Sequence, residues 1–93
     1  MKHYIIVKFK NDYNYIKELN TINDLFEEAL EIDGVNRVEM FKSNSDLSNR
    51  YDLMIRMELT SEGLINFDNS IIHSKWKNEY GKYIENKTIF DCD

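Results

Sequence analysis

The sequence predicts an α+β domain, and three patterns along the chain support this class. Residues 3–9 are rich in β-branched and aromatic side chains, which is typical of a strand. Residues 15–32 carry apolar side chains at steps of three and four, which is the spacing of an amphipathic helix. Further strand and helix patterns follow to the end of the 93 residues, with no repeat and no linker between them. The sequence therefore predicts one mixed domain over 1–93.

The first predicted strand is apolar on both of its faces, with Tyr4 and Ile6 on one face and Ile5 and Val7 on the other. A strand of this kind is covered on both faces. In so short a chain, its own helices supply one cover. A second copy of the chain supplies the other, so the sequence predicts a homodimer that associates through the face of the sheet.

Each later element has its own local signal. The helix over 15–32 is expected to end at Gly34, because glycine readily takes the left-handed conformation of a helix C-cap. Thr60 or Ser61 provides the N-cap of a short helix, and Asn69–Ser70 separates that helix from the next. The expected elements are strands over 3–9, 35–42, 51–59 and 87–91, a helix over 15–32, a short helix from 61 and a helix over 72–83.

The order of these elements is β-α-β-β-α-(α)-β, which is the order of a ferredoxin-like domain with a four-stranded antiparallel sheet. In this topology the first and last strands are antiparallel neighbours. The end of the last strand then lies beside the start of the first. Asp91 is therefore expected to lie opposite His3, although the two stand at opposite ends of the sequence.

The composition argues against several functional classes. The chain has 17 acidic and 12 basic side chains and a net charge of -5, which disfavours nucleic acid because Lys and Arg dominate phosphate binding. It has no run of about 18 apolar residues, so no membrane span is expected. Its three glycines form no nucleotide-binding loop. A lone Cys92 and the lack of an apolar N-terminal run predict a cytoplasmic protein.

Several stretches of the chain, taken in order, resemble one known family. They are residues 2–10 (Lys-His-Tyr-Ile-Ile-Val-Lys-Phe-Lys), 32–35 (Ile-Asp-Gly-Val), 50–53 (Arg-Tyr-Asp-Leu), 69–73 (Asn-Ser-Ile-Ile-His) and 89–91 (Ile-Phe-Asp). Together they resemble the Dabb family, the stress-responsive dimeric α/β-barrel domain. The resemblance implies a homodimer in which two four-stranded sheets pack face to face as a barrel, in agreement with the two-faced first strand.

The resemblance also implies roles for individual residues. Some plant members of the family cyclise polyketides by aldol condensation. Their catalytic histidine stands at the position of His73, a strand histidine at that of His3 and an aspartate at that of Asp91. Their catalytic tyrosine is replaced here by Phe67, and a further pocket histidine by Leu53. Because Phe67 has no hydroxyl, the acid–base pair of those cyclases is incomplete in this chain.

His73 and His3 are the candidate catalytic residues, with Asp91 as the partner of His3. The neutral imidazole of His73 can take a proton near pH 7; the alternative is a histidine that only hydrogen-bonds the backbone at a helix start. Asp91 can fix the tautomer of His3; the alternative is a structural hydrogen bond between two strands. The two histidines lack metal-binding spacing, so neither a metal ion nor a cofactor is expected.

Three functional hypotheses follow. In the first, a homodimer holds a small hydrophobic or aromatic molecule in a small apolar pocket near His3 and His73. In the second, the chain is a cofactor-free cyclase, isomerase or monooxygenase-like enzyme with His73 as the base. In the third, it is a non-catalytic structural or stress-related dimer. The side chains expected to line the pocket are Phe67, Leu53, Ile5 and Trp76.

Overall fold

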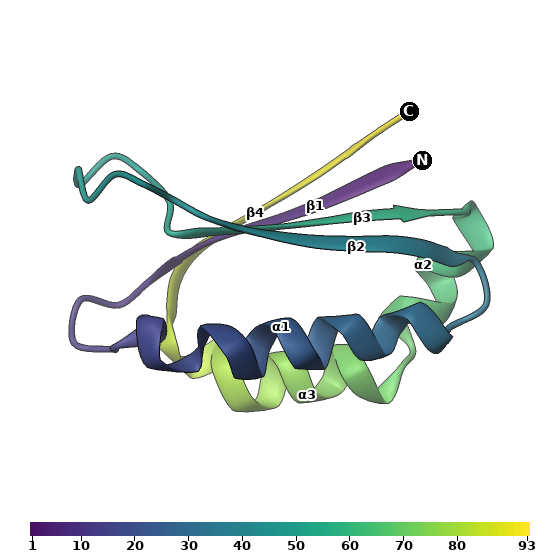
Figure 1. Ribbon diagram of the computed structural model, residues 1–93, viewed down its shortest axis with the longest axis horizontal. Helices are drawn as coiled ribbons and strands as arrows, with labels where there is room; N and C mark the ends of the chain where they lie inside the picture. The colour runs from purple at the N-terminus through teal and green to yellow at the C-terminus, as the bar shows by residue number, and fades with distance from the viewer.

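Helices cover one face of a four-stranded antiparallel sheet and leave the other face open (Figure 1). The computed structural model describes residues 1–93. Its elements are β1 (Lys2–Phe9), the 3-10 turn η1 (Tyr15–Glu18), α1 (Leu19–Glu27), η2 (Glu28–Glu31), β2 (Val35–Lys42), β3 (Leu53–Leu59), α2 (Ser61–Asp68), α3 (Ile71–Tyr80), η3 (Gly81–Tyr83) and β4 (Ile84–Cys92). This is the ferredoxin-like order predicted from the sequence. None of the helices has the length and apolarity needed to cross a membrane.

The strands lie in the order β2-β3-β1-β4, so β1 and β3 are central and β2 and β4 form the edges. The antiparallel register pairs His3 with Met57 on β3 and with Asp91 on β4. The predicted position of Asp91 opposite His3 is therefore confirmed. The start of β1 and the end of β4 lie together at the end of the sheet where α2 is found (Figure 1).

The core lies between the sheet and the helices. β1 and β3 alternate strictly, so that every second side chain is buried. Trp76 of α3 meets Phe26 of α1 edge to face, with the ring centres 5.0 Å apart, and this contact joins the two helices. The buried apolar side chains are Ile5, Val7, Phe9, Ile22, Leu25, Phe26, Ala29, Val35, Leu53, Ile55, Met57, Leu59, Phe67, Trp76 and Tyr80.

The long helix expected over 15–32 is divided into three parts. The α-helix covers only Leu19–Glu27, and 3-10 turns precede and follow it. A 3-10 turn has about three residues per turn rather than 3.6, so an apolar stripe with α-helical spacing does not stay on one face through it. Accordingly, Ile16 is 55% exposed and Leu30 is 46% exposed.

The later boundaries shift by a few residues. The last helix, expected over 72–83, ends as an α-helix at Tyr80 and continues as a 3-10 turn. β4 begins at Ile84 rather than at 87, because this turn already delivers the chain to the sheet beside Phe9. The start of β3 is slightly later than expected.

Two glycines in contact join α2 to the start of β2. Gly34 has a φ of 91°, in agreement with the predicted left-handed cap, and its carbonyl accepts a hydrogen bond from the Thr60 amide at 2.8 Å. The Thr60 hydroxyl oxygen caps α2 by accepting from the Gly63 amide at 3.0 Å. A Cβ atom added to Gly63 would lie 2.4 Å from the Gly34 carbonyl oxygen. The backbones therefore approach too closely for a side chain at Gly63.

Tyr13 packs in an aromatic cluster at the end of β1. Its ring stacks on Tyr83 with centres 4.0 Å apart and planes 7° from parallel, and it also lies 5.5 Å from the Phe9 ring. Burial, followed by the charge of Glu18, raises the pKa of Tyr13 from 10.0 to about 12. The folded protein therefore holds the Tyr13 proton to a higher pH than the unfolded chain does.

This pKa shift predicts a pH-dependent stability. The contribution of Tyr13 is complete below pH 10.0 and is lost as the pH rises toward about 12. We expect Tyr13→Phe to lessen the fall in unfolding free energy between about pH 9 and about pH 11, measured by urea denaturation. The raised pKa values of Tyr15 and Tyr80 contribute to the fall that remains. An equally steep fall in the variant would contradict the prediction.

The open face of the sheet combines apolar side chains with paired charges. One row across the strands is Phe41, Met54, Ile6 and Thr88, and the next is Glu39, Arg56, Tyr4 and Phe90. Arg56 donates to the Glu39 carboxylate at 2.5 Å and to the Tyr4 hydroxyl at 3.3 Å. Phe41 and Phe90 stay 44% and 57% exposed, so a substantial apolar surface faces away from the helices.

Candidate functional site

His3 and Asp91 form a hydrogen-bonded pair across β1 and β4. The distance from His3 Nδ1 to Asp91 Oδ1 is 2.5 Å, and the pairing follows directly from the register of the two strands. His3 is buried, whereas the Asp91 side chain is 43% exposed. An ionised carboxylate only accepts hydrogen bonds, so Nδ1 of His3 carries the proton and the lone pair of the neutral ring is on Nε2.

His73 stands in the first turn of α3 and is held by two local contacts. Its amide donates to the Ser70 hydroxyl oxygen, which is the N-cap of the helix, at 3.2 Å. Its Nδ1 lies 3.1 Å from the Asp68 carbonyl oxygen. Because a carbonyl is also only an acceptor, Nδ1 donates and Nε2 is again left with the lone pair. His73 therefore makes the backbone hydrogen bond that is expected if its role is structural. Its Nε2 atom has no hydrogen-bond partner in the protein.

Phe67 packs beside both histidines. Its ring centre lies 6.4 Å from that of His3 and 5.1 Å from that of His73. The side chain is fully buried and comes from α2, the short helix beside the start of β1. Phe67 therefore contacts both imidazoles through its ring and offers no hydroxyl to either of them.

A cavity of about 270 Å³ reaches both histidines. Its apolar walls come from the sheet and from the two helices that follow β3. Polar side chains on β4 and at the junction of α2 with α3 complete it, so the cavity is only partly apolar. The lining residues are His3, Ile5, Leu64, Asp68, His73, Trp76, Lys87, Ile89 and Asp91.

Ile5 and Trp76 line the cavity as expected, but two other expected residues do not. Phe67 is packed behind the wall. Leu53 lies elsewhere, because β3 is antiparallel to β1 and pairs Leu53 with Val7, far from His3. Lys87 and Ile89 also line the cavity but were not predicted from the sequence. They lie on the same face of β4 as Asp91, so the register that placed Asp91 could have identified them.

The two histidines that line this cavity each have one ring nitrogen without a partner. Nε2 of His3 and Nε2 of His73 have no hydrogen-bond partner in the protein, while each Nδ1 is held by an oxygen. Such a nitrogen accepts a hydrogen bond from a ligand hydroxyl, or takes a proton from an acid near pH 7. Lys87 adds one cation to the lining.

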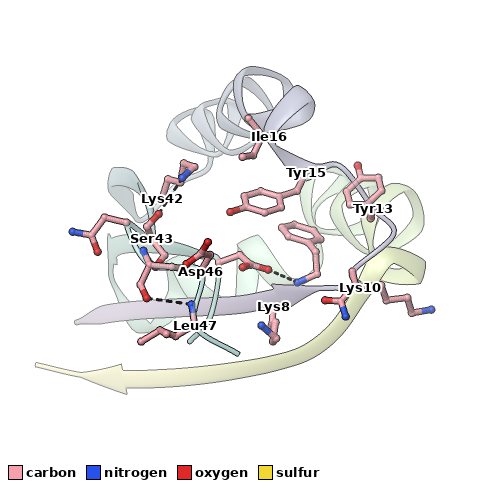
Figure 2. Close-up of a pocket in the computed structure, with 14 residues that line it drawn as sticks. Lys8, Lys10, Tyr13, Tyr15, Ile16, Lys42, Ser43, Asp46 and Leu47 are labelled. Carbon is pink, nitrogen blue, oxygen red and sulfur yellow. Dashed lines mark hydrogen bonds between the residues drawn. The ribbon is translucent and has the colours of Figure 1, made fainter. Parts of the chain in front are cut away.

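A second cavity, of about 540 Å³, lies at the other end of β1 (Figure 2). It is bounded by Phe9, by the segment that carries Tyr13 and Tyr15, and by the loop that follows β2. The sequence reasoning missed it entirely. The sequence of this loop shows only that it is polar. No periodic pattern in the sequence indicates that the loop lies near the aromatic residues.

Solved structures resemble this chain over almost its whole length. A Dabb family protein with a ferredoxin-like fold from Mesorhizobium loti superposes with a TM-score of 0.73 at 15% identity, over 99% of this chain and 93% of that chain. The chain has a Dabb-type fold. No protein-family profile matches its sequence, and no curated protein matches it.

Other similar structures carry different descriptions. A dimeric ferredoxin-like protein of unknown function from Thermobifida fusca gives a TM-score of 0.80 at 8% identity, over 96% of this chain and 85% of that chain. A hydroxynitrile lyase from Passiflora edulis gives 0.74 at 12% identity, over 96% of this chain and 87% of that chain. At such identities the likeness concerns the fold alone.

Proposed function

We propose that the protein is a Dabb-type homodimer whose cavity at His3 and His73 binds a small hydrophobic or aromatic molecule. The observation that carries the proposal is that two histidines, each with an Nε2 atom that has no partner in the protein, line one cavity of about 270 Å³. Trp76, Ile5 and Leu64 supply apolar contact for the body of a ligand. A hydroxyl on the ligand would donate to an imidazole, so small phenols and alcohols fit this lining best.

The ligand proposal is tested by adding 4-propylphenol or octanoic acid to the purified protein. Binding is measured by thermal denaturation and by the NMR signals of the imidazoles. We expect the phenol to raise the melting temperature and to shift the signals of His3 and His73. Ile89→Trp, which fills the cavity from β4, is expected to abolish both effects.

The matched control for Ile89→Trp is Ile71→Trp, because Ile71 is 72% exposed and does not line the cavity. Binding by this control together with loss of binding by Ile89→Trp supports the proposed cavity. No response to a broad panel of phenols, alcohols and fatty acids would overturn the proposal and favour the non-catalytic structural dimer.

The dimer is proposed to form through the open face of the sheet. Exposed Phe41 and Phe90 on that face support it, as does the description of several similar structures as dimeric. We expect Phe90→Glu to weaken association about 100-fold, since it places an unpaired charge in the interface. Sedimentation at micromolar concentration measures this, with Ile65→Glu on the exposed side of α2 as the control. A native protein that sediments at 11.2 kDa, the mass of one chain, would contradict the proposal.

A second candidate function is a cofactor-free enzyme with His73 as the base. The observation that favours it is the fixed tautomer of His73, whose Nδ1 is engaged by the Asp68 carbonyl while Nε2 is free. His3 and Asp91 would form the companion acid–base pair. Once a substrate is identified, turnover that is unchanged in His73→Ala would eliminate this function.

A further inference from the structure

The cavity at the far end of β1 is separate from the histidine site (Figure 2). Phe9, which lines it, stands six positions along β1 from His3, so the two sites are about 20 Å apart. The cavity lies on the helix side of the sheet, where Phe9 points. A dimer formed through the opposite face would therefore leave it open.

Stacked aromatic rings form one wall of this cavity. The Tyr15 ring lies on the Phe9 ring with centres 5.1 Å apart and planes 14° from parallel, and Ile16 and Leu47 extend the apolar lining. Figure 2 shows the Tyr15 hydroxyl directed into the cavity, toward the loop that carries Ser43 and Asp46. No side chain or carbonyl hydrogen-bonds to this hydroxyl in the protein, so it is available to a ligand.

Two aspartate carboxylates next to this wall have acceptor oxygens without a partner. Asp52 uses one carboxylate oxygen, Oδ2, to accept from the Phe9 amide at 2.8 Å, and its other oxygen has no partner. The Asp46 carboxylate also lines the cavity and forms no hydrogen bond or ion pair. Burial and then the charge of Asp52 raise the pKa of Tyr15, which is the effect of a carboxylate close to the phenol.

Three lysines also line the cavity, and two of them donate to backbone carbonyls. Lys8 Nζ donates to the Arg50 carbonyl at 3.1 Å, and Lys42 Nζ donates to the Ser43 carbonyl at 3.1 Å. Lys8 also lies on the side of β1 away from Tyr15 (Figure 2). Lys10 is exposed at the rim. Next to the Tyr15 ring, the cavity combines the carboxylates of Asp46 and Asp52, one free hydroxyl and an aromatic wall.

We propose that this cavity binds a small organic ammonium ion with an aromatic or short aliphatic body. The ammonium would lie between the carboxylates of Asp46 and Asp52 and the Tyr15 hydroxyl, where charge-assisted hydrogen bonds form. Its hydrocarbon part would pack on Tyr15, Ile16 and Leu47, and the aromatic rings attract a cation through their faces. The net charge of -5 on the chain adds a general attraction for cations.

Three compounds of nearly equal size and different charge test the proposal on the full chain. They are 2-phenylethylamine, 2-phenylethanol and phenylacetate, titrated separately while the backbone amide NMR signals are followed. We expect the amine to bind most tightly and to shift the amides of Phe9, Tyr15 and Leu47. Phenylacetate binding as tightly as the amine would overturn the proposal. So would amine-induced shifts confined to His3 and His73, or the absence of any saturable shift.

Two charge variants give opposite expectations. Asp46 and Lys42 are both exposed, so neither Asp46→Asn nor Lys42→Gln is expected to disturb folding. Asp46→Asn is expected to weaken amine binding about tenfold. Lys42→Gln is expected to leave it unchanged or to strengthen it. The reverse order, with the lysine variant weakened and the aspartate variant unaffected, would show that the cavity takes anions and would overturn the proposal.

Discussion

Gly63→Ala is expected to lower the unfolding free energy by about 3 kcal/mol. The added Cβ would lie 2.4 Å from the Gly34 carbonyl oxygen, well inside van der Waals contact. The oxygen belongs to the backbone and the backbone also sets the position of the Cβ, so no side-chain rotation relieves the overlap. Relief requires α2 to move away from the start of β2, and that movement also breaks the hydrogen bond from the Thr60 amide to Gly34.

The measurement is urea denaturation of both proteins, with the change read from the midpoint at constant slope. Gly81→Ala is the matched control, because a Cβ at Gly81 meets no atom within 4 Å and its φ of -54° suits alanine. This control is expected to be neutral or slightly stabilising. Equal effects of the two substitutions would mean that the contact with Gly34 does not limit position 63.

Phe67→Ala is expected to lower the unfolding free energy by about 4 kcal/mol, which is within the range for a fully buried phenylalanine. The ring packs against Phe26 in the core and against both imidazoles. Its removal leaves a cavity between α2, α3 and β1. For a domain of this size, the loss is a large part of the total stability.

Phe67→Ala also tests the role of this ring at the histidine site. Without this ring, His3 and His73 each lose an aromatic packing contact, so the imidazole NMR signals of both are expected to shift. Phe67→Leu is expected to cost less and to shift them less. Ile65→Ala on the same helix is the control, because Ile65 is 60% exposed and its truncation is expected to change stability by less than about 0.5 kcal/mol. Signals unchanged in Phe67→Ala would contradict the role assigned to the ring.

The architecture and one site contact were predictable from the sequence for a shared reason. Strand and helix periods are local, and the ferredoxin-like order leaves few ways to arrange four strands. Once β1 and β4 are antiparallel neighbours, Asp91 must lie near His3, and the structure places them 2.5 Å apart. Contacts that follow from strand register can therefore be predicted from the sequence alone.

Other features depend on packing that has no local pattern. The exposure of Ile16 and Leu30 follows from 3-10 turns, whose spacing is not visible in an apolar stripe. The contact of Gly34 with Gly63 joins two elements whose separation is set by the whole core. Leu53 was placed in the pocket by resemblance alone, and the strand register moves it away from His3.

Because β4 is an edge strand, the histidine cavity is assembled on the part of the sheet with the least support. Asp91, Lys87 and Ile89 all come from this strand, so the cavity exists only while the last part of the chain remains docked on the first. Local opening of β4 would dismantle the site without unfolding the rest of the domain. A ligand bound between β4 and α3 would therefore stabilise the docked position of the C-terminal strand. The stability of this edge of the sheet would rise with the occupancy of the site.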